Sequence, residues 1–163
     1  MKKLREKIGH DPIFMPAVAC FIYKDGKLLL QRRTDDSKWA AHGGAMEFGE
    51  EILETLDREI MEELGVKPIN PQFLKVYAGK DLHYFYPGGD EVYGVTIFYL
   101  VEEYEGDLKI NPEEVSEIKW FDINGLPELR ELHKPDVRPI MEVVEYLKGR
   151  GNKANYLAEE GED

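Results

Sequence analysis

Residues 43–66 read GGAMEFGEEILETLDREIMEELGV, a glycine-rich loop that runs into an acidic helix. The residues from Glu50 to Leu64 favour helix, and Gly65 followed by Pro68 ends it. Acidic residues at the start of this helix suit the positive end of its dipole. The segment therefore predicts a loop–helix–loop unit whose helix carries many carboxylates.

Three of these carboxylates gather on one side of the predicted helix. At about 100° per residue, Glu59, Glu62 and Glu63 fall within an arc of roughly 100°. Glu63 also projects into an apolar stripe, formed by Ile52, Leu53, Leu56, Ile60 and Leu64. A carboxylate there is costly to desolvate unless a cation or strong donors offset it. Oxygen-only ligands favour Mg²⁺, with Mn²⁺ as the alternative, and Mg²⁺ commonly binds through carboxylates plus substrate phosphates. The cluster therefore predicts a phosphate-bearing ligand.

Two neighbouring features could contact such a ligand. Gly43 and Gly44 lack Cβ atoms, so their backbone can approach a ligand closely and turn a carbonyl oxygen toward a metal. Arg32 and Arg33 end a predicted strand beside the loop, where they either receive phosphate oxygens or form a solvated strand end.

Arg58 is the one basic residue of the predicted helix. It lies four residues from both Glu54 and Glu62, the spacing at which opposite charges pair on a helix surface. We therefore expect Arg58 to organise carboxylates rather than to bind a ligand.

The rest of the chain reads as a mixture of strands and helices without regular βαβ alternation. Asp25-Gly26 between two apolar runs predicts a hairpin over residues 16–33. The other predicted elements are a loop over 34–49, strands near 72–77, 92–102 and 117–121, and a closing helix over 137–148. We expect an α/β fold in which helices flank a mixed sheet. Residues 1–148 would form a single domain, and the polar, acidic residues 149–163 a loose tail.

Composition limits the partners and the compartment. The chain has 163 residues, and 21 Lys and Arg against 33 Asp and Glu give a net charge of −12, which argues against binding a nucleic acid polymer. The single cysteine, Cys20, lies in an apolar run and is expected to be a buried thiol. No window resembles a signal peptide or a membrane span, so we expect a soluble cytoplasmic protein.

Residues 44–66 resemble the Nudix box of the MutT-type hydrolases, G-x5-E-x7-R-E-U-x-E-E-x-G-U with U aliphatic. Every fixed position is filled, by Gly44, Glu50, Arg58, Glu59, Ile60, Glu62, Glu63, Gly65 and Val66. The order of the flanking strands extends the resemblance over roughly residues 15–148. The resemblance implies a Nudix-like α/β/α sandwich with a mixed β-sheet, in which the loop–helix–loop presents metal ligands to a diphosphate.

The resemblance also implies metal ligands. Glu62 and Glu63 would be the main ligands, with the carbonyl of Gly43 beside them. Glu59 would bind metal or help to deprotonate water.

The same resemblance gives roles to residues around these ligands. Glu50 would complete the acidic metal site, and Glu47 is a plausible additional ligand. Arg58 would orient the carboxylates. A further acidic catalytic residue often comes from a loop before a late strand, for which Glu114 is the candidate and Glu117 the alternative.

The implied activity is Mg²⁺-dependent hydrolysis, by activated water, of a nucleoside diphosphate linked to another moiety. The substrate would be a nucleoside triphosphate, a dinucleoside polyphosphate or a nucleotide sugar, bound by Arg32, Arg33 and Tyr84. A tyrosine near the position of Tyr84 is associated in the family with diadenosine polyphosphate hydrolysis. His42 stands where the family commonly has proline, as a loop substitution or as a substrate contact. A homodimer is common in the family, and the alternative function is a non-catalytic nucleotide-binding regulator.

Overall fold

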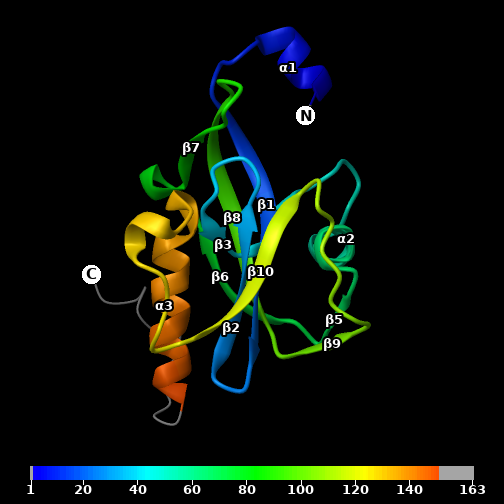
Figure 1. The fold of residues 1–163 in the computed structure, drawn as a ribbon. Coiled ribbons are helices and arrows are strands. Elements are labelled where there is room, and N and C mark those ends of the chain that lie inside the picture. The colour runs from blue at the N-terminus through cyan, green and yellow to red at the C-terminus, as the bar shows by residue number, and fades with distance from the viewer. Residues whose placement is uncertain (1, 151–163) are drawn as a thin grey trace, which may run out of the picture.

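A mixed β-sheet runs through the centre of the molecule, with one long helix on each face (Figure 1). The structure, a computed structural model, describes residues 2–150. In the order β10-β2-β1-β8-β6, the main strands are Val115–Asp122, Lys27–Arg33, Ile13–Lys24, Glu91–Val101 and Gln72–Tyr77. β1 pairs in parallel with β8 and antiparallel with β2. The expected α/β/α sandwich with a mixed sheet is confirmed.

The hairpin between β1 and β2 turns where the sequence predicts. Asp25 and Gly26 both have positive φ, 51° and 77°, and Lys24 pairs with Lys27 across the turn. Asp and Gly tolerate this left-handed backbone, which matches the twist of the two strands. The turn fixes the register that brings Gln31 and Arg33 of β2 beside the candidate site.

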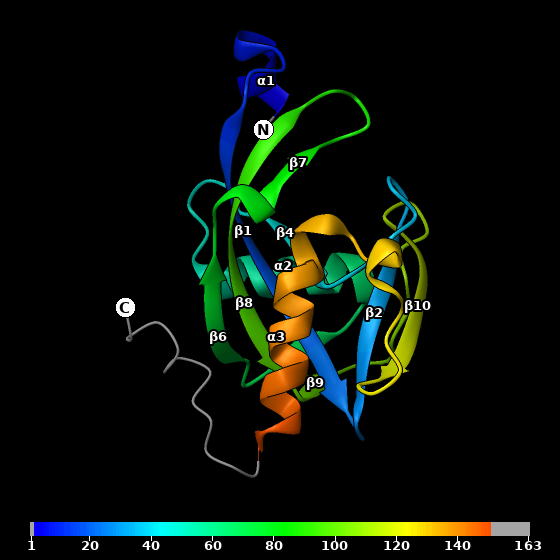
Figure 2. The ribbon, with the colours of Figure 1, turned by 90° about the vertical axis from the view of Figure 1, so that its left-hand side faces the viewer.

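Alternating side chains of β1 pack into two cores, one under each helix. Val18, Cys20 and Ile22 are fully buried against α2, which spans Ile52–Leu64. Phe21 lies on the other face, among the residues under α3. Figure 2 shows α3, Val137–Lys148, lying across this second face as the sequence predicts. Each large aliphatic side chain buried in this way stabilises the fold by about 1.5–3 kcal/mol.

Helix α2 begins later than expected and buries a narrower stripe. Its N-cap is Glu51, whose side chain forms a reciprocal capping box with Glu54, and it ends at Gly65 in the left-handed region, φ 69°. Glu50 therefore lies in the preceding loop rather than in the first turn. Two of the five predicted stripe residues, Ile52 and Leu53, are exposed, whereas Leu56, Ile60 and Leu64 are fully buried.

Part of the expected loop over 34–49 is sheet. β3, Trp39–Ala40, pairs with β2, and β4, His42–Ala45, pairs antiparallel with β1. A Cβ built on Gly43 would lie 2.1 Å from the Val18 carbonyl oxygen, so only glycine allows this pairing. The glycine pair that suggested a loop instead lets two backbones come together.

The remaining elements lie around the sheet. The short helix α1 stands beyond one end of it, next to the hairpin of β7 and β8 (Figures 1 and 2), where Arg5 Nη2 donates to the Glu91 carbonyl oxygen at 2.8 Å. The additional elements are α1 Lys2–Ile8, β5 Lys67–Ile69, β7 His83–Phe85, β9 Glu103–Glu105 and the 3-10 helices η1 Lys80–Leu82, η2 Leu129–Glu131 and η3 Lys134–Asp136.

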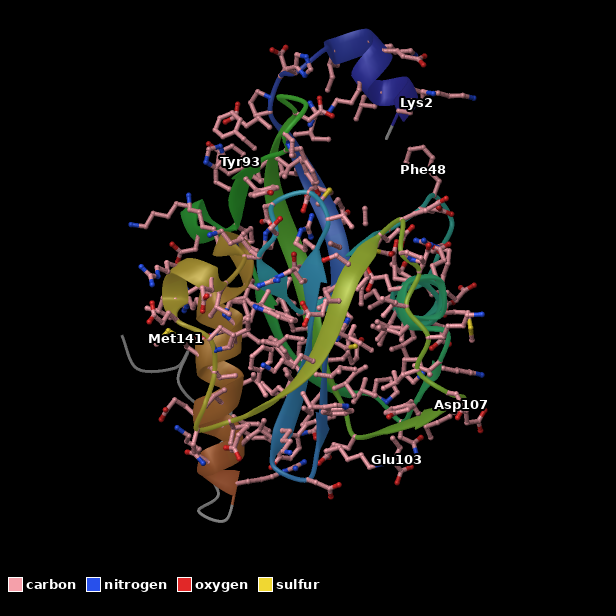
Figure 3. All side chains as sticks on the ribbon, viewed as in Figure 1. Lys2, Phe48, Tyr93, Glu103, Asp107 and Met141 are labelled. Carbon is pink, nitrogen blue, oxygen red and sulfur yellow. The ribbon has the colours of Figure 1, made fainter. Side chains whose placement is uncertain are left out.

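Two features bear on the ends and the surface of the chain. Of the tail expected over 149–163, residues 151–163 lie outside the described part, and Arg150 forms a bidentate ion pair with Glu102. Within residues 2–150, no helix has the length and apolar character needed to span a membrane. Figure 3 shows Phe48 projecting away from the body from the loop before α2, and this side chain is fully exposed.

Candidate active site

The guanidinium of Arg58 is the centre of the acidic cluster on α2. Its Nε donates to Glu50 Oε2 at 2.6 Å, and its Nη1 donates to Glu59 Oε1 at 2.8 Å and Glu62 Oε2 at 3.3 Å. The expected pairing with Glu54 is wrong, because Glu54 Oε1 accepts from its partner in the capping box at the N-terminus of the helix. The expected pairing with Glu62 is present.

Glu50 reaches Arg58 from the loop that precedes α2. Its carboxylate accepts two hydrogen bonds from Arg58, one from Thr55 Oγ1 at 3.0 Å and one from the Glu47 backbone N–H at 2.7 Å. The hydrogen bonds from Arg58, followed by that from the Glu47 backbone, lower the pKa of Glu50 to about 2. Glu50 thus ties the loop to the helix, whereas the Glu47 carboxylate is more distant, 3.8 Å from Arg58 Nε.

Glu63 points into the protein, as its place in the apolar stripe predicts. Its side chain is buried, with 7% of the residue exposed, and Oε2 accepts from Gln31 Nε2 at 3.0 Å and from the Gly43 N–H at 3.1 Å. Burial raises the pKa of Glu63 well above its ordinary value, and the neighbouring Glu59 adds to the shift. These two donors hold the carboxylate beside β4.

Glu59 lies against the backbone of Gly44. A Cβ built on Gly44 would lie 2.5 Å from the carboxyl carbon of Glu59. Burial raises the pKa of Glu59, and repulsion from Glu62 and Glu114 adds to the rise, while the hydrogen bond from Arg58 opposes it. The absence of a side chain at Gly44 is therefore what gives this carboxylate its space.

Of the two acidic residues considered near the late strand, Glu114 is the one whose charge acts on the cluster. Its charge raises the pKa of both Glu59 and Glu63. Glu117 on β10 instead lies 3.4 Å from Arg32 Nη1.

The arrangement of the carboxylates decides whether the cluster could bind a metal ion. Among residues 2–150, no three His, Cys, Asp or Glu side chains are arranged as a group that could hold a metal ion. The reason is that Arg58 gathers Glu59 and Glu62 while Glu63 turns to Gln31. The donors are nevertheless all oxygens, and burial, followed by repulsion between neighbouring carboxylates, raises the pKa values of Glu59 and Glu63. Such a set fits a hard divalent cation, which relieves that repulsion.

A cleft begins on the other side of the glycine pair. Gly43 and Gly44 line it, together with residues of β1 and β8 and with Tyr84 and Tyr86 of the β7 hairpin. His42 also lies in its wall but is fully buried, with Nε2 2.9 Å from the Leu29 carbonyl oxygen, and burial lowers its pKa to about 4. The same two glycines thus contact the acidic cluster and the cleft.

Of the two arginines predicted to contact substrate, only Arg33 lines this cleft. It forms a bidentate pair with Asp35, at 2.8 and 2.7 Å, and lies 6.0 Å from the ring centre of Tyr84. Arg32 instead stacks over Trp39 at 4.9 Å.

Tyr84, predicted to contact substrate, lines the cleft within a cluster of aromatic rings. Its ring lies 5.1 Å from Tyr86 and 4.7 Å from His133, both edge to face. Its hydroxyl donates to Asp36 Oδ2 at 3.3 Å, and burial, followed by the charges of Asp35 and Asp36, raises its pKa to about 12. His133 and Asp36 belong to no motif, and we find no sequence signal that could have identified them.

Comparisons with known proteins agree on one family. The family model of the NUDIX domain matches residues 13–144. An ADP-ribose pyrophosphatase of Methanocaldococcus jannaschii is 34% identical over 131 residues, which are 77% of this chain and 73% of that protein. A nucleoside triphosphatase NudI of Escherichia coli is 33% identical over 111 residues, 63% of this chain and 78% of that protein. The crystal structure of a MutT NUDIX hydrolase from Burkholderia pseudomallei superimposes with a TM-score of 0.67 at 24% identity, covering 80% of this chain and 97% of that one.

Proposed function

The chain belongs to the NUDIX family of hydrolases, which act on phosphoric anhydrides of nucleoside diphosphate derivatives, and we propose that it cleaves the pyrophosphate bond of a small nucleotide with the help of Mg²⁺. The observation that carries this proposal is the contact of one glycine pair with both the Arg58 cluster and the cleft. A diphosphate between them would have carboxylates on one side and room for the nucleoside on the other.

The metal would be held by Glu59, Glu62 and Glu63, with the carbonyl of Gly43 beside them. When bound, Mg²⁺, or Mn²⁺ in its place, supplies charge neutralisation at the phosphates and makes water more acidic. Gln31 and the Gly43 N–H occupy Glu63 Oε2, so no described hydrogen bond uses Glu63 Oε1.

The other residues of the cluster position these carboxylates. Arg58 holds Glu59 and Glu62 in place, and Glu50 fixes Arg58 from the opposite side. Glu47 is the outermost carboxylate of the group. We assign proton acceptance from the attacking water to Glu59 or to Glu114, whose charge acts on Glu59.

The nucleoside part of the substrate would occupy the cleft, beside Arg33 and Tyr84. Arg33 can approach phosphate oxygens while Asp35 holds its guanidinium. Arg32 has no place in this scheme, because its side chain is committed to Trp39 and Glu117. The net charge of −12 favours a small nucleotide over a nucleic acid polymer. We place this activity in a single domain over residues 1–148, working in the cytoplasm.

The test is a hydrolysis screen with and without Mg²⁺ or Mn²⁺, over nucleoside triphosphates, dinucleoside polyphosphates and nucleotide sugars. We expect cation-dependent phosphate or nucleotide release that Glu62→Gln abolishes while the circular dichroism spectrum is unchanged. The matched control is Asp57→Asn, which removes one negative charge from the same helix outside the cluster. A folded Glu62→Gln protein with full activity would disprove the assignment.

A further inference from the structure

We infer that His133, oriented by Asp36, is a specificity-determining residue that accepts a hydrogen bond from the exocyclic amino group of the substrate's nucleobase. The inference rests on the proposed function, since it takes the cleft to be the place of the nucleoside. It adds a substrate class to that function: nucleotides of an amino-bearing base.

The imidazole of His133 is fixed on several sides. Its Nδ1 lies 2.5 Å from Asp36 Oδ2, and its backbone N–H donates to the Trp39 carbonyl oxygen at 2.7 Å. Asp36 is itself held, because its Oδ1 accepts from the Lys38 backbone N–H at 2.9 Å. Only 5% of His133 is exposed, yet the residue lines the cleft. The ring therefore presents a defined edge to whatever occupies the cleft.

The contact with Asp36 determines what that edge offers. A carboxylate can only accept, so Nδ1 must carry the proton that lies between the two side chains. In the neutral ring Nε2 then has a free lone pair, and it makes no hydrogen bond to any residue within 2–150. A ligand that fills the cleft displaces water from this acceptor and would leave it without a partner, so the matching ligand group is an N–H or O–H donor.

The surroundings favour a base over a sugar. The rings of Tyr84 and Tyr86 line the same cleft, and Tyr84 packs edge to face against His133. Aromatic side chains pack well against flat rings such as nucleobases, whose amino groups lie in the ring plane. Sugar hydroxyls are donors too, so the test must separate the two sources.

The first measurement is calorimetric binding of AMP, which has no anhydride and therefore reports on the cleft independently of hydrolysis. In mildly alkaline buffer we expect AMP to bind about fivefold more tightly than purine riboside 5′-monophosphate, which lacks the amino group. The His133→Ala protein should bind both equally. The proposal would be overturned if the unmodified protein bound the two ligands equally or did not bind AMP. It would also be overturned if affinity fell only when the ribose hydroxyl was removed, in 2′-deoxy-AMP.

A second variant tests the orientation of the proton. In Asp36→Asn the amide oxygen can keep the bond from the Lys38 N–H, which turns the NH₂ group toward His133 Nδ1. Nδ1 then accepts and Nε2 carries the proton, so the affinity for a base with a carbonyl group should rise relative to the affinity for a base with an amino group. We expect the affinity for IMP relative to AMP to rise about fivefold over that of the unmodified protein. If the role of Asp36 were merely structural, the substitution would weaken the binding of both ligands equally, and that result would overturn the proposal.

Discussion

Replacing Gly44 with alanine should impair catalysis without unfolding the protein. The new Cβ would lie 2.5 Å from the Glu59 carboxyl carbon and must be relieved to an ordinary contact of at least 3.4 Å, a displacement of about 0.9 Å. The atom that must move is the end of a flexible side chain, and the φ of Gly44 is not in the left-handed region. A misplacement of about 1 Å in a catalytic geometry can cost about 100-fold in rate. We therefore expect kcat/KM to fall about 100-fold while the free energy of unfolding falls by about 1 kcal/mol.

Two other glycines provide the comparison. The Cβ of Gly43→Ala would lie 2.1 Å from the Val18 carbonyl oxygen, at φ 144°, so this variant should disrupt the β1–β4 pairing and lose stability. Gly88→Ala meets nothing within 4 Å and should change neither quantity. Urea denaturation and steady-state kinetics on the substrate found by the screen measure both effects. Full activity in Gly44→Ala, or a loss of stability equal to that of Gly43→Ala, would refute the reasoning.

Further substitutions separate residues that the sequence could not. Arg33→Ala should raise KM about tenfold, because a charged donor leaves the cleft, whereas Arg32→Ala should leave KM within about twofold; equal effects in steady-state assays would contradict the cleft assignment. Glu114→Gln should lower kcat about 100-fold and Glu117→Gln should not, and the reverse order would show that the wrong carboxylate was chosen. His42 has a pKa of about 4 in the folded protein against an ordinary 6.5, so the unfolded chain takes up the proton first as pH falls. Urea denaturation should show that the free energy of unfolding falls by about 3 kcal/mol between pH 6.5 and 4 because of this residue. The His42→Asn protein should not show this fall, and its absence from the unmodified protein would mean that the ring is hydrated rather than buried.

The sequence predicts the fold best where one face of an element is buried. The closing helix over 137–148 has the predicted bounds, because its apolar period matches the surface against which it packs, and the strand over 72–77 also has the predicted bounds. β4 is missed because His42–Ala45 has no strand-like composition. Its pairing depends on Val18, far away in the chain, and on the room that a missing side chain leaves there. Local propensity cannot contain that information.

The site residues, too, are predicted where helical periodicity governs them and missed where distant parts of the chain meet. The helical period alone turns Glu63 inward, and the structure agrees. The partners of Arg58 are predicted only in part, because Glu50 reaches it from a loop that the helical wheel does not include. His133 and Asp36 are almost a hundred residues apart, and the pairing of Leu132 and His133 with Trp39 of β3 brings them together.

The charges around Arg58 explain why so acidic a chain can act on phosphates. One guanidinium faces the carboxylates of Glu50, Glu59 and Glu62, and Glu63 carries a further acid group beside them. The hydrogen bonds from Arg58 lower the pKa of Glu50. The pKa of Glu59 is raised because burial and repulsion outweigh the hydrogen bond from Arg58, and that of Glu63 is raised because they outweigh the donors Gly43 and Gln31. The cluster thus lacks positive charge, and a divalent cation brought by an anionic substrate would supply it. Because such binding requires ionised carboxylates, the affinity for the cation should increase with pH as Glu59 and Glu63 lose their protons.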